Sequence, residues 1–342
     1  MNILIIQTAF IGDLILTTPL FREIANRYGK CNLYAIVNKG TELILEGNPY
    51  ISKIIGFDKK MVKSSPFYFF SFILEIRKLK PDICISPHFS HRSSLISFFS
   101  GAKIRIGYKE SGFSFLHTKK IKRPIKKVHE VDKLFSLVTD DKIIEPRLRR
   151  PELYLKEEDI AIGNSILSEQ NLKLKDYILV SPSSVWETKR MPSEKFVELI
   201  QKIISNTNYN ILLAGSKSDM PLTSKIKNNF SERVFDISGK TNLGQLSYII
   251  SQSIAVVSND SSPIHFASAH NIPTVAIFGA TVPDFGYTPL SDKYFISEIP
   301  GLECRPCGIH GGNHCPKLHF KCMNNQDTNT ILNELLKLTI PG

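Results

Sequence analysis

Short apolar runs alternate with longer amphipathic stretches along the whole chain. Five runs rich in Ile, Val and Leu lie in the first half, at 2–8, 32–37, 53–57, 82–87 and 105–108. Six lie in the second half, at 177–182, 210–214, 234–237, 255–258, 274–278 and 294–297. Stretches with helical spacing separate the runs, at 14–27, 67–79, 91–100, 157–170, 193–206, 219–229, 243–251 and 262–270. Apolar strands that alternate with helices predict parallel sheets covered by helices on both faces.

Two such series predict two doubly wound α/β domains. A length of 342 residues suits this division, since one domain usually takes roughly 100–200 residues. The boundary is expected in the polar stretch 139–151 or in the helix 157–170. We therefore predict an N-terminal Rossmann-like domain over 1–155 and a C-terminal one over 170–326. The remaining segment, 327–342, is expected to form a helix that packs back on the first domain.

No run approaches the ~18 apolar residues of a membrane span. The first residues also lack the basic region and cleavage site of a signal peptide. These patterns predict a cytoplasmic protein that is at most peripheral to a membrane.

Positive charge is concentrated in the first half. Residues 1–150 carry 26 Lys and Arg against 13 Asp and Glu, whereas residues 151–342 carry 17 against 19. The stretch 119–127 alone has six basic residues among nine. Such a run is usually a solvated face, but on a basic half it indicates an anionic partner, either nucleic acid or an anionic lipid surface.

Asp13 follows the first strand, where a helix begins. The turn before it lacks the three glycines of a dinucleotide fingerprint, which disfavours a nicotinamide oxidoreductase. A carboxylate here either caps the helix or acts as a proton acceptor at the carboxyl end of the sheet. Ligands of parallel sheets bind at this end of the strands.

Three polar turns of the second half also follow strands, and two of them are described first. Ser183, Ser184 and Lys189 lie in a loop whose hydroxyl groups and cations suit phosphate oxygens. Asp219 follows a strand that ends at a Gly turn, where either a helix cap or a ribose contact is expected.

The turn 259–265 has the most specific composition. Asp260, Ser261 and Ser262 precede a helix that starts at a proline, a favourable first helical residue. Free N–H groups of such a turn are predicted to bind a diphosphate, with His265 facing it from the first turn. Capping by Asp260 or Ser261 is the simpler interpretation, and the two are compatible.

Four cysteines lie close together near the C-terminus. They are spaced Cys304-x2-Cys307-x7-Cys315-x6-Cys322 and have histidines between them. Four thiols within 19 residues suggest a structural, tetrahedral zinc site. The alternative is a compact loop of reduced cysteines.

These segments together resemble glycosyltransferase family 9, the ADP-heptose:lipopolysaccharide heptosyltransferases, and within it heptosyltransferase II. The resemblance spans nearly the whole chain and is carried by NILIIQTAFIGDLILTTP (2–19), SGKTNL (238–243), VSNDSSPIH (257–265), PTVAIFGATVP (273–283) and CRPC (304–307). It implies the GT-B fold, in which two Rossmann-like domains face a central cleft. It also implies inverting transfer of L-glycero-D-manno-heptose from ADP-heptose to the lipopolysaccharide inner core.

The family's residues carry over to matching positions of this chain. Asp13 matches its proposed catalytic base. Its donor-binding positions match Ser183, Ser184, Lys189, Asp260, Ser261 and His265, with Ser262 standing where many members have Gly and Asp219 as a looser match to the ribose-binding carboxylate. Transfer in the family requires no cofactor. The implied partners are ADP-heptose and the lipid A-core acceptor at the cytoplasmic face of the inner membrane, and no nucleic acid is expected.

Two alternatives remain open at this point. One is a family 9 transferase that uses another sugar nucleotide or acceptor. The other is a nucleic-acid-binding protein with a zinc module, which explains the basic half and the cysteines but leaves the turn at 259–265 without a purpose.

Overall fold

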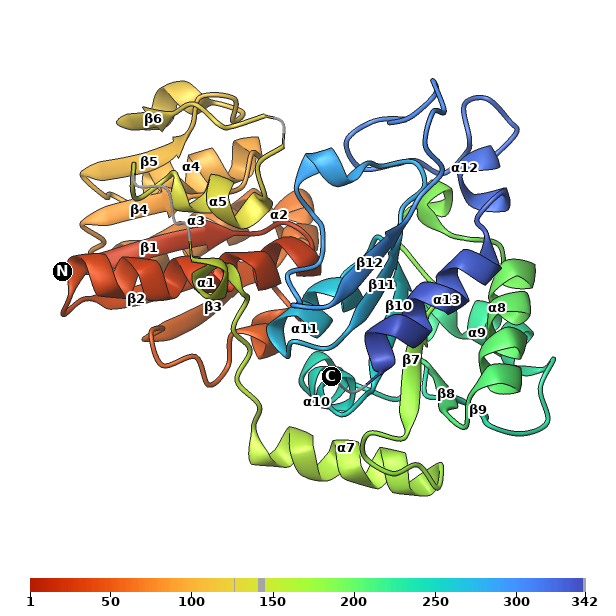
Figure 1. Ribbon diagram of the computed structural model, residues 1–342. Helices are drawn as coiled ribbons and strands as arrows, with labels where there is room; N and C mark the ends of the chain where they lie inside the picture. The colour runs from red at the N-terminus through yellow and green to blue at the C-terminus, as the bar shows by residue number, and fades with distance from the viewer. Residues whose placement is uncertain (126, 141–144, 341–342) are drawn as a thin grey trace. The chain divides into compact units, whose positions relative to one another are not determined.

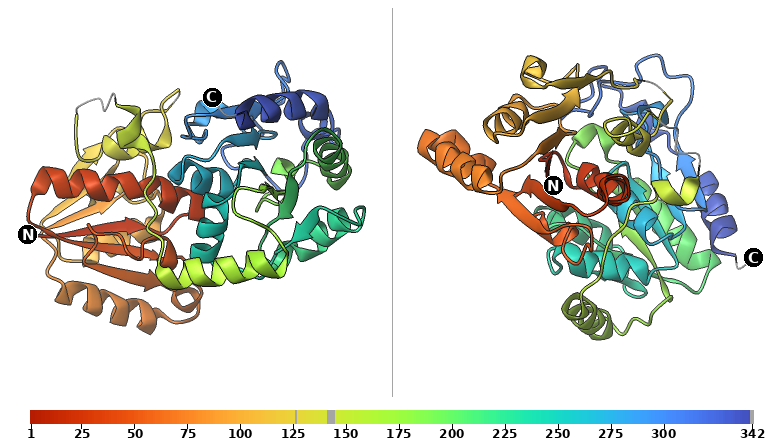
Figure 2. Two further views of the ribbon diagram at one scale, coloured as in Figure 1. Left: turned by 60° about the horizontal axis from the view of Figure 1, so that its bottom comes forward. Right: turned by 90° about the vertical axis from the view of Figure 1, so that its left-hand side faces the viewer.

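The chain forms two compact units, Met1–Tyr154 and Leu155–Gly342. The computed structural model describes residues 1–125, 127–140 and 145–340. Each unit contains one six-stranded parallel sheet with helices on both faces, which confirms the predicted α/β class (Figures 1 and 2). Three parts of the sequence predictions lie outside the described residues: Lys126 of the basic run, residues 141–144 of the boundary stretch and residues 341–342 of the terminal segment.

The first unit has the strand order β3-β2-β1-β4-β5-β6. Its strands are β1 (Asn2–Gln7), β2 (Asn32–Asn38), β3 (Lys53–Phe57), β4 (Ile83–Ser86), β5 (Ile104–Tyr108) and β6 (Lys119–Ile121). Its helices are α1 (Ile11–Tyr28), α2 (Lys59–Ser64), α3 (Pro66–Lys78), α4 (His91–Phe99), α5 (Glu130–Phe135) and α6 (Pro146–Arg149), with 3-10 turns η1 (Glu42–Ile44) and η2 (Ser114–Leu116).

The central strands of this sheet are buried on both faces. Leu4 and Ile6 of β1 pack with Phe72 and Ile76 of α3 and with Ile96 of α4. Side chains alternate along a strand, so the neighbouring positions of β1 face the opposite side, where α1 and α5 pack on each other. The continuous apolar runs seen in the sequence are the result of this two-sided burial.

Strand β6 was not predicted, because its residues belong to the basic run 119–127. It pairs only with β5, where Ile106 lies opposite Lys119. Lysines on an edge strand keep it from pairing with another chain, so a charged sequence is compatible with a strand at this place.

The second unit has the order β12-β11-β10-β7-β8-β9. Its strands are β7 (Tyr177–Ser181), β8 (Asn210–Leu213), β9 (Val234–Asp236), β10 (Ala255–Asn259), β11 (Thr274–Ile277) and β12 (Tyr294–Ser297). Its helices are α7 (Glu157–Glu169), α8 (Ser193–Asn206), α9 (Met220–Lys227), α10 (Leu243–Ser251), α11 (Pro263–Ala269), α12 (Lys321–Asn324) and α13 (Thr328–Thr339), with 3-10 turns η3 (Glu187–Lys189), η4 (Lys217–Asp219) and η5 (Pro283–Phe285).

The terminal helix α13 packs on the core of the second unit through its apolar side. Its apolar stripe, Ile331, Leu332 and Leu335, is buried in the same core as Phe196 of α8. The helix contacts α8 and the strands β10, β11 and β12. An amphipathic helix has one such stripe, and here the second sheet covers it.

Among the described residues, no helix is both long and apolar enough to cross a membrane.

A partly buried histidine links two helices of the second unit. His270 ends α11, and its Nε2 lies 2.8 Å from the Ser247 hydroxyl on α10. Burial lowers the pKa of His270 to about 4, and the charge of Lys175 adds to the shift. The native imidazole therefore stays neutral at a pH where that of an unfolded chain takes up a proton.

We expect acid to destabilise the fold through this group. Between about pH 6.5 and pH 4 the unfolded state binds the extra proton, so the stability present above this window is lost as the pH falls. The contribution of His270 is at most about 1.4 kcal/mol per pH unit. Thermal unfolding at pH 7 and pH 5 should show a smaller loss of midpoint for His270→Asn than for the unmodified chain.

The matched control is Ser247→Ala, which removes the same hydrogen bond but keeps the imidazole. It should lower the unfolding midpoint at both pH values and retain the full pH dependence. An unchanged pH dependence in His270→Asn would contradict the assignment.

Candidate functional site

In each sheet the chain reverses its strand order beside the first strand of the unit. β1 lies between β2 and β4, and β7 lies between β8 and β10. At such a point the loops that leave neighbouring strands diverge to opposite faces, which makes room for a ligand at the carboxyl ends. Most of the predicted site residues follow β1 in the first unit and β7 or β10 in the second. They therefore lie at the two places where the strand order reverses.

A buried ion pair occupies this point in the second unit. Lys189 Nζ lies 2.6 Å from Asp260 Oδ2, and the exposed fractions of the two side chains are 14% and 7%. The Thr281 hydroxyl also donates to Asp260 Oδ2, at 2.6 Å. A charge buried this deeply is stable only when it is paired and hydrogen-bonded, and Asp260 meets both conditions.

Asn259 joins the two loops that carry this pair. Its Oδ1 accepts a bond from Met191 N at 3.1 Å, and its Nδ2 donates to the Pro182 carbonyl at 2.7 Å. The Ser261 hydroxyl adds a longer bond of 3.4 Å to the Ser183 carbonyl. The loop after β7 is therefore fixed against the end of β10, which brings the predicted positions Ser183, Lys189, Asp260 and Ser261 together.

His265 lies in the first turn of α11 and is buried. Burial lowers its pKa to about 3, and the charge of Lys189 contributes. Its Nδ1 is buried and has no hydrogen-bond partner among the described residues. A buried polar atom without a partner costs free energy, so this neutral ring offers an unused group to a ligand.

The turn before α11 has fewer free N–H groups than predicted. Ile264 N donates to the Ser261 carbonyl at 3.3 Å, and His265 N donates to the Ser262 carbonyl at 2.9 Å. Two of the expected backbone donors for a diphosphate are thus already bonded within the turn. Side chains of the joined loops must supply a larger part of any anion site here.

Ser184 and Asp219 occupy different environments. Ser184 is buried, and its carbonyl accepts a bond from Arg190 Nε at 2.7 Å. Asp219 follows β8, the neighbour of β7, and its Oδ2 accepts bonds from Ser216 N at 2.8 Å and Ser216 Oγ at 2.6 Å. The capping role considered from the sequence is therefore present at Asp219.

The zinc site suggested on Cys304, Cys307, Cys315 and Cys322 stays a prediction. Across the described ranges, no three Cys, His, Asp or Glu side chains are grouped so as to hold a metal ion. Cys322 is buried in the core of the second unit, while the Cys307 thiol donates to the Cys304 carbonyl at 3.1 Å. The thiols nevertheless lie close enough to interact, because the charges of Cys304, Cys307 and Cys315 add to the burial that raises the pKa of Cys322 to about 11.

The cysteine-rich segment also holds the loops that carry the pair between Lys189 and Asp260. Gly312 N donates to Thr188 Oγ1 at 2.8 Å, and Thr188 N donates to the Gly312 carbonyl at 3.0 Å. Arg305 Nη2 donates to the Thr281 carbonyl at 2.8 Å. The residue before Lys189 and the partner of Asp260 are both held by this segment, a role that its sequence did not signal.

The corresponding point of the first unit carries Asp13. It lies in the first turn of α1, and its Oδ2 accepts a bond from Phe10 N at 3.2 Å. In the preceding loop, Thr8 Oγ1 lies 3.0 Å from Nδ1 of His88, in the loop after β4, and 3.3 Å from the hydroxyl of Ser93, in α4. The loops after β1 and β4 are thus joined beside the predicted base.

Lys59 lies near Asp13, and Arg92 lies near Lys59. Lys59 Nζ donates to the Thr8 carbonyl. Burial and the charge of Arg92 lower the pKa of Lys59, while Asp13 opposes the shift. The same two cations add to the burial that lowers the pKa of His88 to about 4. Lys59 therefore places positive charge beside Asp13, and the nearby imidazole of His88 is neutral. No pattern in the sequence indicated Lys59, His88 or Arg92.

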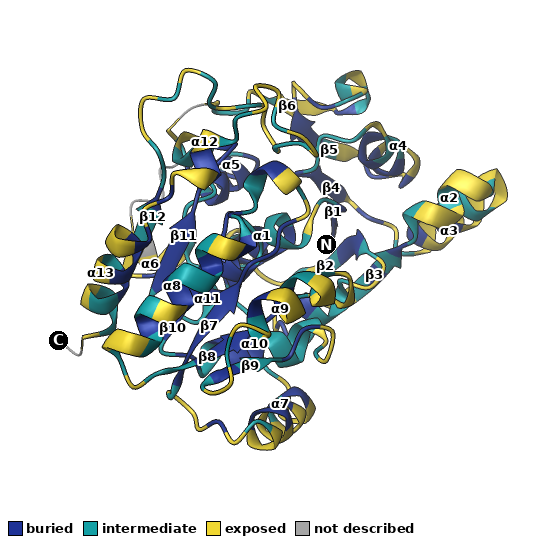
Figure 3. Cartoon of the chain, turned by 90° about the vertical axis from the view of Figure 1, so that its right-hand side faces the viewer, coloured by how far each residue is buried: buried dark blue, intermediate teal, exposed yellow. Residues whose placement is uncertain are grey.

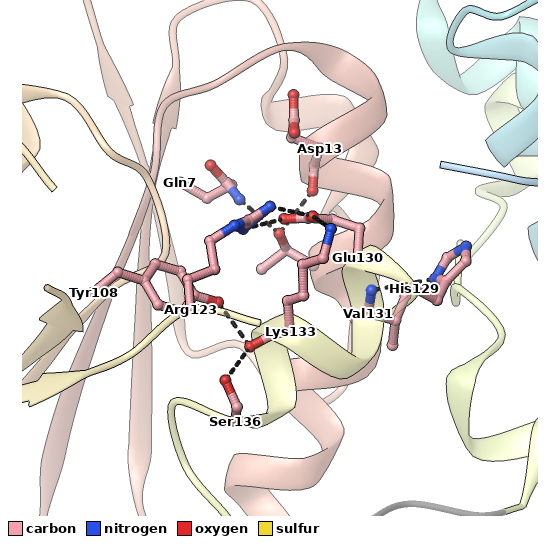
Figure 4. Close-up of polar contacts among 10 residues, drawn as sticks. Gln7, Asp13, Tyr108, Arg123, His129, Glu130, Val131, Lys133 and Ser136 are labelled. Carbon is pink, nitrogen blue, oxygen red and sulfur yellow. Dashed lines mark hydrogen bonds and ion pairs between the residues drawn. The ribbon is translucent and has the colours of Figure 1, made fainter. Parts of the chain in front are cut away.

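A second buried charge cluster lies between α5 and α1. Arg123 bonds both carboxylate oxygens of Glu130, and Lys133 Nζ lies 3.5 Å from Glu130 Oε2. Figure 4 shows this cluster beside the helical turn that carries Asp13. Burial raises the pKa of Glu130 to about 7. The charges of Arg123 and Lys133 oppose this shift, whereas the charge of Asp13 adds to it.

Arg123 also lies over two aromatic rings, 4.8 Å from the Phe89 centroid and 5.3 Å from that of Tyr108. A basic run such as 119–127 is usually a solvated face, but Arg123 is largely buried, because its guanidinium pairs with Glu130, which lies outside the run.

Comparison with known proteins agrees with this arrangement. Residues 69–312 match the sequence model of glycosyltransferase family 9 (heptosyltransferase). Lipooligosaccharide heptosyltransferase 2 of Haemophilus influenzae is 27% identical over 92% of this chain and 94% of its own length. Lipopolysaccharide heptosyltransferase 2 of Escherichia coli is 24% identical over 86% of each chain.

Solved structures show the same fold. ADP-heptose lps heptosyltransferase II of E. coli superposes with a TM-score of 0.78 at 22% identity, over 99% of this chain and 98% of that one. A family 9 glycosyl transferase of Veillonella parvula gives a TM-score of 0.85 at 21% identity, over 99% and 97%. These likenesses confirm the predicted GT-B class, and because the family match spans more than half of the residues, the chain belongs to glycosyltransferase family 9 (heptosyltransferase).

Proposed function

We propose that this enzyme transfers heptose from ADP-heptose to the inner core of lipopolysaccharide. The observation that carries the proposal is similarity over nearly the full length to proteins named heptosyltransferase 2. The geometry adds a buried cation and an unused imidazole nitrogen at the point of the second sheet where ligands bind. The nucleic-acid alternative loses its support, since the family is shown.

The second unit, over 170–326, is proposed to bind the donor. Lys189 supplies the positive charge for the diphosphate, and Asp260 holds its ammonium group in place. The hydroxyl groups of nearby loops complete the site, contributed by Ser183, Ser184, Ser261 and Ser262. His265 donates from Nδ1 as a neutral ring, and Asp219 is assigned to the ribose hydroxyls.

The first unit, over 1–155, is proposed to bind the acceptor. Asp13 accepts the proton of the acceptor hydroxyl as its oxygen forms the bond to C1 of heptose. The bond from C1 to the phosphate oxygen breaks on the opposite face, so the configuration inverts and ADP leaves. Positive charge accumulates at C1 in such a transition state, and Lys189 stabilises the negative charge that develops on the leaving group. No cofactor takes part in these steps.

Lys59 and Arg92 are proposed to face the anionic groups of the acceptor. The charge of Arg92 lowers the pKa of Lys59 and that of Asp13 raises it, so both residues lie close to Lys59. Two half-buried cations beside one carboxylate leave a local excess of positive charge, which a phosphate or carboxylate of the acceptor neutralises. The proposed place of action is the cytoplasmic face of the inner membrane.

Replacing Asp13 with Asn should remove the base and keep the size of the side chain. We expect acceptor-dependent ADP release to fall by about 10²–10⁴-fold, the usual contribution of general base catalysis. The affinity for ADP should be unchanged, because the donor residues lie in the second unit. Glu23→Gln, farther along α1, is the control and should retain full turnover. Equal turnover in Asp13→Asn and Glu23→Gln would remove Asp13 from the mechanism.

Replacing Lys189 with Met should weaken ADP binding. A hydrogen bond to a charged group contributes about 1.5–3 kcal/mol, which corresponds to roughly 10–100-fold in Kd. The variant also leaves Asp260 buried without its cation, which should lower the free energy of unfolding by about 3–5 kcal/mol. Calorimetric titration with ADP and thermal unfolding measure the two effects.

Lys195→Met provides the control for Lys189→Met, because Lys195 pairs with Glu198 on the partly exposed side of α8. It should bind ADP normally. An ADP affinity that survives in folded Lys189→Met would contradict the donor site.

A further inference from the structure

Helices α2 and α3 expose an unusual number of apolar side chains. Five of the seven residues from Pro66 to Phe72 are aromatic. One side of α3 packs into the first core through Phe72, Ile73 and Ile76. The other side carries Phe67, which is 78% exposed, Phe70 at 59% and Leu74 at 47%. Figure 3 shows this exposed side along both helices.

The apolar surface continues onto the end of α4. The rings of Phe69 and Phe99 meet edge to face with centroids 6.4 Å apart, and Phe98 lies 5.2 Å from Phe99. Phe98 and Phe99 are 42% and 41% exposed. We call the set Phe67, Phe70, Leu74, Phe98 and Phe99 the aromatic face. Soluble proteins rarely expose so many large rings together unless the surface binds something.

Cations border the aromatic face at both ends. The segment 59–80 contains six basic residues and a single acidic one, Glu75. Lys60 and Lys63 precede α3, and Arg77, Lys78 and Lys80 end or follow it; all five are exposed. The carboxylate of Glu75 lies 3.3 Å from Lys53 Nζ, so its charge is balanced.

This combination fits the surface of an anionic bilayer. A helix at such a surface buries aromatic and aliphatic side chains among the lipid chains and keeps its lysines at the headgroups. Each Lys or Arg near an anionic surface adds a favourable electrostatic contribution. A second copy of this chain fits less well, because it would place two rows of cations opposite each other.

The aromatic face is connected to the candidate acceptor site within the same unit. Lys59 begins α2, and its ammonium group bonds the Thr8 carbonyl in the loop that leads to Asp13. A surface that holds α2 at the membrane therefore also holds this loop near the headgroups.

We propose that the aromatic face docks on anionic phospholipid and brings the loop before Asp13 to the headgroups of the bilayer. The claim of membrane docking rests on the exposed rings and cations alone. The delivery of a lipid-linked acceptor to Asp13 rests on the proposed function.

The test is co-flotation of the full chain with vesicles of phosphatidylethanolamine and phosphatidylglycerol, without nucleotide sugar or lipopolysaccharide. We expect the chain to float with these vesicles and to remain behind with pure phosphatidylcholine. The double variant Phe67→Ser/Phe70→Ser should lose partitioning by tenfold or more, and so should Lys60→Glu/Lys63→Glu. Leu174→Ser, an exposed apolar residue of the second unit, should float like the unmodified chain.

Three results would overturn docking: no flotation of the unmodified chain, flotation that the Phe67→Ser/Phe70→Ser variant retains, or a solution dimer that this variant dissociates while vesicle binding persists. Circular dichroism verifies that each variant is folded.

A parallel assay separates docking from the proposed function. ADP release with a water-soluble, deacylated acceptor should be the same for the unmodified chain and the Phe67→Ser/Phe70→Ser variant, and only turnover of vesicle-embedded acceptor should fall. Flotation without any ADP release would leave docking intact and refute the transfer reaction.

Discussion

The buried pair between Lys189 and Asp260 is the interaction on which the candidate donor site depends. Neither charge is stable at this depth without the other, so the loop after β7 must close against the end of β10. Thr281 completes the bonding of the carboxylate, and Asn259 fixes the loop by two bonds to its backbone. The ammonium group is thereby held in place before a ligand arrives, and the site does not have to reorganise when negative charge develops near it.

The first unit uses the same kind of constraint at the corresponding point of its sheet. Arg123 and Lys133 enclose the buried carboxylate of Glu130 on α5, and α5 packs on the helix that carries Asp13. Glu130 lies near Asp13 and is paired with Arg123 and Lys133. A change in this cluster would therefore change the charge around Asp13. In both units, buried charges position loops at the carboxyl ends of strands, where a parallel sheet leaves room for chemistry.

Much of this arrangement could be predicted from the sequence, because both sheets consist of continuous apolar runs and the polar turns follow them directly. That pattern located Asp13, Lys189 and Asp260. It could not locate partners that are distant in sequence, such as Glu130 and Thr281, because only the fold brings them to these positions. The charge pattern alone also misled, because a basic run contained an edge strand and a largely buried arginine.

The most direct test of the account is the identity of the transferred sugar. The purified chain should be incubated with heptose-deficient lipopolysaccharide core and, separately, with ADP-heptose, ADP-glucose and UDP-glucose, and the products weighed by mass spectrometry. The account predicts that one heptose is added from ADP-heptose and that the other donors give little or no product. Addition of a hexose in preference to heptose would keep the family and contradict the donor, and no product from any donor would contradict the proposed reaction.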